Sequence, residues 1–366
     1  MSTTKPVPRT SVLQLPAYVQ GKSELEGAAK PIKLSSNESA LGPSPKVIEA
    51  INAALKEVNR YPDGNQQALR SAIAETHELD PARIICGSGS AELLGLMIRS
   101  YVGPGDELVL SENSFGMLNI DGLAQGATLA KAPERDYTID VDALLARVTT
   151  NTRMVAIANP NNPTGTYLNE TEILRLHGSL PTNILLVLDA AYAEFVGKDD
   201  YNIGTSLVEK YDNVIMTRTF SKAYGLAGLR IGWGYFPVDV CQVVQRLRVP
   251  YNITNVAMAA AIAAVRDKAY VANVCVRTQR WVERITKELT ALGLYVVPSV
   301  TNFYLIDFNR GIGSASGAHR YLESRGIIPR PIGSGTDAEV LRITIGSDNE
   351  NEVLLAAMRE YVALLG

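Results

Sequence analysis

Residues 217–234 read TRTFSKAYGLAGLRIGWG, and the interpretation of the whole chain starts from this stretch. It follows the apolar run 214–216, which is typical of a buried strand. Lys222 lies among hydroxyls, small residues and apolar side chains, with no acid nearby in the sequence. Because burial disfavours the charged ammonium, we expect a lowered pKa for Lys222. A lysine needs such a pKa to attack a carbonyl and hold it as a Schiff base.

Two hydroxyls and one fixed positive charge flank this lysine: Thr219, Ser221 and Arg230. Such a set of side chains suits a phosphate group. An amine that captures an aldehyde beside a phosphate site suggests pyridoxal phosphate. The alternative is a surface lysine whose ammonium reaches solvent, which is the commoner environment for this residue type. That alternative leaves the motifs described below unexplained.

The composition is that of a chain with a large buried core. Of the 366 residues, 46% are hydrophobic and 20% are charged, which argues against disorder. The length fits one large domain plus a smaller one. A net charge of -3 and dispersed Lys and Arg residues argue against nucleic acid or an acidic membrane as the main partner.

The three cysteines and three histidines lie far apart in the sequence. Because none of their spacings is typical of metal ligands, we expect no metal site, and we expect no disulfide framework. Isolated thiols fit a reducing cytoplasm. The chain has neither an N-terminal signal sequence nor a run of about eighteen apolar residues, so we expect a soluble cytoplasmic protein.

Short apolar strands alternate with amphipathic helices through most of the chain. The expected strands are 83–86, 107–110, 127–131, 153–158, 184–188, 214–217 and 229–235. The expected helices between and before them include 65–78, 90–101, 115–125, 140–148 and 170–178. This alternation predicts an α/β fold in which a mostly parallel sheet is covered by helices on both faces.

The pattern changes after a helical run at 238–292. Further strands at 294–297, 303–308 and 341–345, with helices at 315–325 and 349–365, predict a smaller α+β domain. The first 43 residues are rich in proline, which predicts an extended arm that packs on the small domain or on a partner subunit. We therefore divide the chain into an arm (1–43), a large domain (44–265) and a small domain (266–366).

The first of the other motifs, Gly87-Ser88-Gly89-Ser90-Ala91-Glu92, joins the strand at 83–86 to the helix at 90–101. The glycines permit a tight turn, and the amides at a helix start form an anion site. A dinucleotide fingerprint is the alternative. That fingerprint requires a third glycine, which is missing, and an acidic residue at the end of a second strand about twenty residues later, which is also missing.

A second motif, Asn159-Pro160-Asn161-Asn162-Pro163-Thr164-Gly165, follows the strand at 153–158. It consists of turn residues and could be only a turn. Open α/β sheets bind ligands at the carboxyl ends of their strands, so the amide of Asn162 could instead point at a ligand.

A third motif places Asp189 at the end of the strand 184–188, with Tyr192 three residues later. An acid at this position is often a helix N-cap. At the carboxyl edge of a sheet, an acid can also keep a pyridine nitrogen protonated. Tyr192 could then donate a hydrogen bond to an anionic oxygen on the same ring.

In the order GSGSAE, NPNNPTG, DxxY and TFSKxxxLAGLR, these motifs resemble those of the fold-type I pyridoxal-phosphate aminotransferases. Toward both ends the resemblance narrows to the histidinol-phosphate aminotransferase family. It rests there on LPAY around Tyr18, LSSNESALGPSP at 34–45, RYPDG around Tyr61, IIPRPI around Arg330 and LRITIG around Arg342. The chain departs from the family at two motifs. Many relatives read NENP-x-G where this chain has NESALG at 37–42, and GxGSDE where it has GSGSAE at 87–92.

The resemblance implies pyridoxal 5'-phosphate as cofactor, with Lys222 holding it covalently and moving a proton between substrate and cofactor. Asp189 would pair with the ring nitrogen, and Asn162 and Tyr192 would hydrogen-bond the ring oxygen. Phe115 would stack on the ring, although it could also be a core residue that opens a helix. The cofactor phosphate would lie among the amides of Ser90 and Ala91, the side chains of Thr219, Ser221 and Arg230, and Tyr61 of a second subunit. Glu92, in the same motif as Ser90, would be a further cofactor-binding residue. The role of Tyr61 implies a homodimer with shared active sites.

The resemblance also implies where the substrate binds. Arg342 matches the family's substrate-anion arginine, Arg330 would add a second charge for a phosphate, and Tyr18 and Asn162 would line the pocket. The implied reaction converts histidinol phosphate and 2-oxoglutarate to imidazole-acetol phosphate and glutamate, in histidine biosynthesis.

Four other activities remain open. An aromatic amino acid aminotransferase shares these motifs and would tolerate loss of Arg330, whereas a threonine-phosphate decarboxylase would release carbon dioxide. A dinucleotide-binding dehydrogenase would use GSGSAE and give no cofactor absorbance from a lysine adduct. A non-catalytic sensor on the same fold would usually need a DNA-binding module, and the arm before residue 44 is too short for one.

Overall fold

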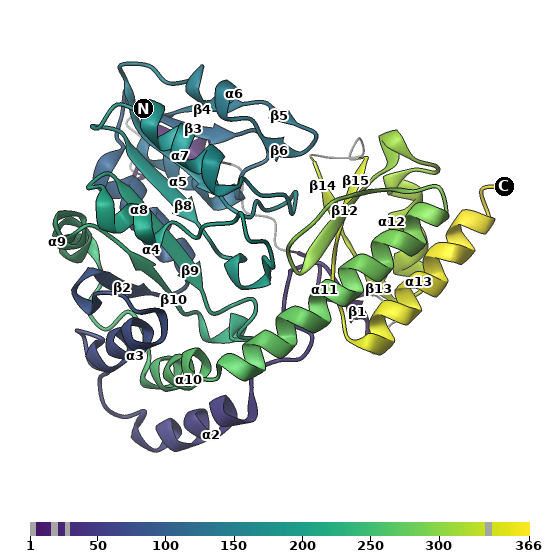
Figure 1. Ribbon diagram of the computed structural model, residues 1–366, viewed down its shortest axis with the longest axis horizontal. Helices are drawn as coiled ribbons and strands as arrows, with labels where there is room; N and C mark the ends of the chain where they lie inside the picture. Colours follow the sequence, from purple (N-terminus) through teal and green to yellow (C-terminus); the bar gives the residue numbers. More distant parts are fainter. Residues whose placement is uncertain (1–4, 16–20, 26–29, 334–338) are drawn as a thin grey trace.

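A mostly parallel sheet is the framework of the larger of two lobes (Figure 1). The computed structural model describes residues 5–15, 21–25, 30–333 and 339–366. Among these residues the sheet has seven strands, in the order β2-β10-β9-β8-β7-β3-β4. They are β2 (Ile84–Gly87), β3 (Glu107–Ser111), β4 (Thr128–Ala132), β7 (Thr152–Ala158), β8 (Leu185–Asp189), β9 (Val214–Thr219) and β10 (Gly232–Tyr235). Only β10 runs antiparallel to its neighbours in this sheet, so the predicted fold class is confirmed.

Helices cover both faces of this sheet, which is why its central strands are buried and largely apolar. In β8, Leu186 and Leu188 join one buried cluster, while Leu185 and Val187 join the cluster on the opposite face. The first face is covered by α2 (Pro45–Ala54), α3 (Gln67–His77), α7 (Glu170–Ser179), α8 (Thr205–Lys210) and α10 (Asn255–Arg266). The second face is covered by α4 (Ser90–Tyr101), α5 (Gly116–Gln125) and α9 (Val238–Leu247).

The smaller lobe has its own antiparallel sheet and its own core. Its strands, in the order β11-β12-β15-β14, are β11 (Tyr295–Val297), β12 (Phe303–Asp307), β15 (Val340–Thr344) and β14 (Arg330–Ile332). Two helices, α12 (Ala315–Ser324) and α13 (Asp348–Ala363), pack with it around side chains such as Tyr304 and Met358. This lobe is the α+β unit that the sequence predicts.

The long helix α11 (Lys268–Ala291) connects the lobes (Figure 1). Its first half contributes Val274 and Cys275 to a buried cluster with Tyr192 and Phe303, one residue from each lobe. Its second half contributes Trp281 and Ile285 to the core of the small lobe. The helix therefore fixes the junction at which the candidate site lies.

The structure contains several short elements that the sequence did not predict. The arm contains a short helix, α1 (Thr10–Leu13), and a strand, β1 (Ile32–Lys33), that pairs in parallel with β13 (Ile327–Ile328) of the small lobe. A small hairpin, β5 (Glu134–Arg135) and β6 (Thr138–Ile139), follows the edge strand β4. In the described part of the chain, no helix combines the length and the apolar character needed to cross a membrane.

Several predicted elements are shorter than expected. The run 238–292 is three helices, because the chain becomes extended at Arg248 and Pro250 follows, where an amide donor is missing. The expected helix 140–148 is only α6 (Val141–Leu145). The expected strand 229–235 begins at Gly232, because Arg230 adopts a left-handed conformation with φ of 51°.

Candidate active site

Two adjoining cavities lie where the lobes meet, each with a volume of about 300 Å³. The inner cavity is lined by the sheet edge and contains Asp189, Thr219 and Arg230. The outer cavity is lined by the small lobe and contains Arg330 and Arg342. The residues that line both cavities are Ser36, Phe115, Asn162, Tyr192 and Lys222. The two cavities therefore form one continuous candidate site.

Strand register brings the predicted residues of the large lobe together. In the parallel strands β7, β8 and β9, Ala158 pairs with Asp189 and Asp189 pairs with Thr217. All three strands thus end at the same edge of the sheet, and the chain leaves each strand directly into the site. Asn162 follows β7, Asp189 ends β8, and Lys222 follows β9.

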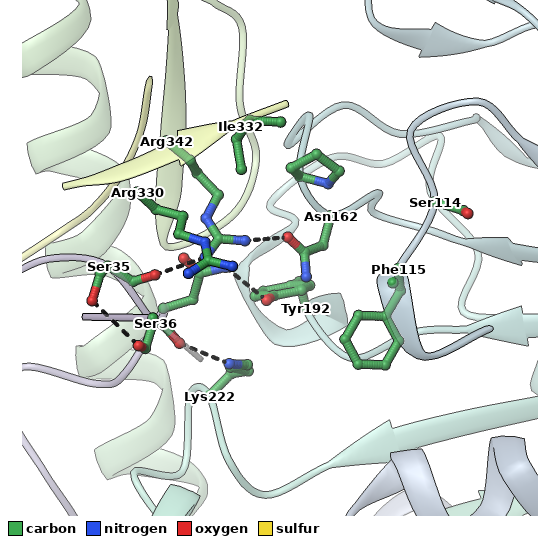
Figure 2. A pocket seen from close by; sticks show the side chains of 14 residues that line it. Ser35, Ser36, Ser114, Phe115, Asn162, Tyr192, Lys222, Arg330, Ile332 and Arg342 are labelled. Carbon is green, nitrogen blue, oxygen red and sulfur yellow. Dashed lines mark hydrogen bonds between the residues drawn. The ribbon is translucent and has the colours of Figure 1, made fainter. Parts of the chain in front are cut away.

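Lys222 lines both cavities. Figure 2 shows its side chain in the outer cavity, beside Ser36. Its Nζ atom donates a hydrogen bond to the carbonyl oxygen of Ser36 at 3.3 Å. Burial is the main cause that lowers the pKa of Lys222 to about 8, and the positive charges of Arg342 and Arg230 add to it. A substantial fraction of this amine is therefore neutral at mildly alkaline pH and able to act as a nucleophile or a base.

Asp189 is buried, with 4% of its surface exposed. Burial raises its pKa to about 6, while a hydrogen bond from the Thr217 hydroxyl at 3.0 Å favours the ionised form. It does not cap a regular helix, because the next element is a 3-10 turn, Ala193–Phe195, which begins after Tyr192. Asp189 is thus a carboxylate at the wall of the inner cavity with few partners of its own.

Tyr192 is fixed by a residue to which sequence reasoning gave no role. Asn37 donates a hydrogen bond from its side-chain amide to the Tyr192 hydroxyl at 2.9 Å. Asn37 is buried and is itself held by Thr344, to which its backbone amide donates at 2.9 Å. Burial raises the pKa of Tyr192 to about 12, so the phenol keeps its proton at physiological pH. With its oxygen accepting from Asn37, that proton can be donated to a ligand.

One end of the inner cavity is built for an anion. The helix α4 begins at Ser90, and the hydroxyls of Thr219 and Ser221 lie 3.0 Å apart beside it. Arg230 donates to the Ser221 hydroxyl at 3.3 Å. Gly89 has a φ of 83°, a conformation that favours glycine, and a Cβ atom there would lie 2.5 Å from the Arg230 guanidinium and push it away from this position. A guanidinium, two hydroxyls and a helix N-terminus together favour a phosphate.

Two arginines of the small lobe face the outer cavity. Arg330 on β14 pairs in register with Arg342 on β15, so the two side chains leave the sheet on the same face. Figure 2 shows both guanidinium groups pointing toward Asn162 and Lys222. Arg342 donates to Asn162 Oδ1 at 2.6 Å and to the carbonyl of Ser35 at 2.8 Å. Like charges on directly opposite residues repel, so this pair is complementary to an anionic ligand.

Two predicted site residues do not line these cavities, and a third lies outside the described residues. Glu92 accepts hydrogen bonds from the Ser88 amide and from Asn252 at 2.8 Å, and its carboxylate holds the glycine loop rather than facing the inner cavity. Tyr61 is 83% exposed and stacks on Tyr251 at 4.8 Å between ring centroids. Tyr18 lies outside the described residues. The other predicted residues all line at least one cavity: Ser90, Ala91, Phe115, Asn162, Asp189, Tyr192, Thr219, Ser221, Lys222, Arg230, Arg330 and Arg342.

Known proteins resemble this chain over its full length. A histidinol-phosphate aminotransferase from Paramagnetospirillum magneticum is 49% identical over 360 residues, covering 98% of this chain and 99% of the relative. One from Rhodopseudomonas palustris is 47% identical over 362 residues, with the same coverage. The crystal structure of histidinol-phosphate aminotransferase from Sinorhizobium meliloti, in complex with pyridoxal-5'-phosphate, matches with a TM-score of 0.91. It is 32% identical, and the match covers 100% of both chains.

The sequence profile of one family spans most of the chain and includes every element around the two cavities. It matches residues 29–358, a range that contains Lys222, Asp189 and both facing arginines. Together with the relatives above 45% identity, this match identifies the family. The chain belongs to the family of class I and II aminotransferases.

Proposed function

We propose that this protein is a pyridoxal-phosphate-dependent aminotransferase that exchanges the amino group between histidinol phosphate and 2-oxoglutarate. The observation that carries this proposal is the pair Arg330 and Arg342, which lie side by side on neighbouring strands and line the same cavity as Lys222. The relatives at 49% and 47% identity are histidinol-phosphate aminotransferases, which supports the same activity and a place in histidine biosynthesis. Three unpaired, buried thiols support a cytoplasmic location.

The residues of the inner cavity fit pyridoxal phosphate. Its phosphate suits the anion site at the start of α4, and its ring nitrogen suits the buried carboxylate of Asp189. Asn162 and Tyr192 offer an amide and a hydroxyl for the ring oxygen, and Phe115 offers an aromatic face. When bound, this cofactor supplies an aldehyde that captures amines and a ring that accepts electrons from the substrate carbon.

The protein's own groups then have separate tasks. The Lys222 amine, with its lowered pKa, holds the cofactor and afterwards takes and returns a proton at the substrate carbon. The Asp189 carboxylate keeps the ring nitrogen protonated. The Tyr192 hydroxyl, fixed by Asn37, donates to the ring oxygen. These roles need one neutral amine, one anion and one protonated phenol. With pKa values of about 8 for Lys222, 6 for Asp189 and 12 for Tyr192, all three states are populated near pH 8.

Arg330 and Arg342, which lie side by side on neighbouring strands, explain how one pocket accepts both substrates. A guanidinium binds a carboxylate or a phosphate through two parallel hydrogen bonds. The same pair can therefore bind the phosphate of histidinol phosphate in one half-reaction and a carboxylate of 2-oxoglutarate or glutamate in the other. Binding at one site in turn implies ping-pong kinetics.

Replacing Arg330 with alanine should reduce kcat/KM for histidinol phosphate by roughly 10²-fold, because one charge-assisted contact to the phosphate is lost. The kcat/KM for phenylalanine or tyrosine should fall much less, since these donors carry no phosphate. Arg330→Lys is the matched control and should keep part of the discrimination. Equal losses for both donor classes would favour an aromatic amino acid aminotransferase. Steady-state kinetics with the two donor classes, plus a carbon dioxide assay for decarboxylation, decide the point.

We also propose that two copies of the chain form a dimer in which Tyr61 reaches the phosphate site of its partner. Tyr61 lies in an exposed apolar patch formed by the turn after α2 and the segment before α10. The patch consists of Leu55, Val58, Tyr61, Val249 and Tyr251. The two segments are in contact, since Asn255 donates to the carbonyls of Glu57 and Arg60. Exposed apolar patches of this kind mark protein interfaces.

Mixing two inactive variants tests this arrangement. In a dimer of Tyr61→Ala with Lys222→Ala, one site combines the intact Lys222 of one subunit with the intact Tyr61 of the other. After unfolding and refolding an equal mixture, activity should recover to about a quarter of wild type, because half of the dimers are hybrids with one good site. Each variant refolded alone is the control. No recovery above the sum of the controls would contradict the shared site.

A further inference from the structure

Behind the site, side chains that follow three neighbouring strands meet at one carboxylate. β3 lies between β4 and β7 in the sheet, and all three end at the same edge. Asn113 follows β3, Glu134 follows β4, and Asn161 follows β7. Sequence reasoning gave Asn113 and Glu134 no role.

The Glu134 carboxylate accepts hydrogen bonds from two loops. Asn113 donates to Oε2 at 2.9 Å, and Asn161 donates to Oε1 at 3.3 Å. Asn161 is fully buried, and its amide also donates to the carbonyl of Asn113 at 2.8 Å and to the Thr164 hydroxyl at 3.0 Å. Its two hydrogens are therefore shared among three acceptors, of which Glu134 is the most distant. The two partners of Glu134 are close in sequence to residues that line both cavities: Asn161 directly precedes Asn162, and Asn113 lies two positions before Phe115.

We propose that Glu134 is a positioning residue that ties these two loops together and so aligns Phe115 and Asn162 for the cofactor. The inference rests on the proposed function, because the cofactor is the ligand whose binding it governs. An ionised carboxylate only accepts hydrogen bonds, which suits the donors that it faces: the side-chain amides of Asn113 and Asn161, the Ser111 hydroxyl and the Asn113 backbone amide. A protonated carboxyl group presents a hydrogen to one of those donors and loses that bond. The hydrogen bonds that connect the two loops through Glu134 are therefore made by its ionised carboxylate and weakened when that carboxylate is protonated.

Protonation of Glu134 occurs near physiological pH. Burial raises the pKa of this carboxyl to about 7, and the negative charge of Glu112 adds a smaller effect in the same direction. The neighbouring Arg135 is paired with Asp140 at 2.8 Å. The loop 159–165 presents amides and hydroxyls but no charge. We therefore expect cofactor affinity to include a component that is lost as the pH falls through about 7.

The effect on stability has the opposite sign. Because the folded-state pKa of Glu134 lies above the ordinary value, the folded state binds the proton more tightly than the unfolded state does. Its contribution to stability is present at low pH and is lost as the pH rises through about 7. A neutral glutamine at this position should thus leave the fold at least as stable as wild type above pH 7, while it breaks one of these hydrogen bonds. A purely structural residue would not separate stability from cofactor affinity in this way.

The test compares cofactor-free wild type, Glu134→Gln, Glu134→Asp and Glu112→Gln between pH 6 and pH 8.5. Titration with pyridoxal phosphate, followed by the absorbance of the bound cofactor, measures affinity, and thermal unfolding of the cofactor-free proteins measures stability. The affinity of Glu134→Gln should be about tenfold weaker than wild type at pH 8.5 and about equal to it at pH 6. Glu134→Asp keeps the charge but not the reach, so it should be weak throughout. Glu112→Gln removes an exposed carboxylate close by, so it should keep the wild-type affinity at pH 8.5, and its loss of affinity should begin at a slightly lower pH because the charge of Glu112 raises the pKa of Glu134.

Three results would overturn the proposal. In the first, the ratio of the pyridoxal phosphate affinities of wild type and Glu134→Gln stays constant with pH. In the second, Glu134→Asp binds pyridoxal phosphate as tightly as wild type does. The third is a lower unfolding temperature of Glu134→Gln above pH 7, which would make the residue a structural support. Failure of wild type itself to bind pyridoxal phosphate would instead reject the proposed function, so the two failures are distinct.

Discussion

Replacing Lys222 with alanine is expected to lower turnover by at least about 10³-fold, because nucleophile and base are lost together. Lys222 is an amine that lines both cavities, and its pKa is lowered to about 8. In wild type, the rate at which the cofactor-free protein captures pyridoxal phosphate should rise with pH and level off above about 8, as the neutral amine becomes the main form. The variant should show neither the capture nor the visible absorbance of the bound cofactor.

The matched control is Lys33, a second amine that lines the inner cavity but is paired with Glu38 at 3.0 Å. Lys33→Ala should keep the cofactor absorbance and most of the activity. Borohydride reduction of the wild-type protein with bound cofactor, followed by peptide mass mapping, should place the label on Lys222. A label on Lys33, or full activity in Lys222→Ala, would reject the assignment on which the proposed function depends.

Replacing Asp189 with asparagine should reduce turnover by roughly 10²- to 10³-fold while the cofactor still binds, since the variant lacks only the charge that keeps the ring nitrogen protonated. The substitution keeps the shape of the side chain and can keep the hydrogen bond from Thr217. Absorbance of the bound cofactor and kcat with saturating donor measure the two effects separately. A turnover close to wild type would exclude the role of Asp189 at the ring nitrogen.

The same variant gives a control in the cofactor-free protein. Burial raises the pKa of Asp189 to about 6, so its contribution to stability is present at low pH and is lost as the pH rises through about 6. Asp189→Asn should lack this loss. Thermal unfolding between pH 4 and pH 7 should therefore show that the variant is destabilised less than wild type as the pH rises. A parallel pH dependence in both proteins would mean that Asp189 is not desolvated in the folded state.

The sequence predicted the large sheet because its strands are continuous apolar runs, and helices on both faces require such runs. The run at 184–188, for example, corresponds to β8. Short or polar strands were missed. β14 has three residues, is only partly buried and contains Pro331, so it shows no periodic signal, although it carries Arg330.

The candidate site was predictable where a functional residue directly follows a strand, as Asn162, Asp189 and Lys222 do. Residues that act through partners distant in sequence were not predictable. Asn37 contacts Tyr192 across 155 positions, and neither residue has a neighbour that indicates this contact. Glu134 opens the two-residue strand β5, and its polar sequence context is that of a solvated loop. The burial that gives it a shifted pKa arises only after three strands assemble.

The pairing of Arg330 with Arg342 also has an evolutionary consequence. Side chains alternate between the two faces of a strand, so a slip of one residue between β14 and β15 would turn one guanidinium to the opposite face. Insertion or deletion of a single codon within β14 or β15 that shifts this register would then change the preferred donor even with both arginines retained. Divergence of substrate choice among proteins of this architecture can therefore occur through backbone alignment, without any replacement of a charged side chain.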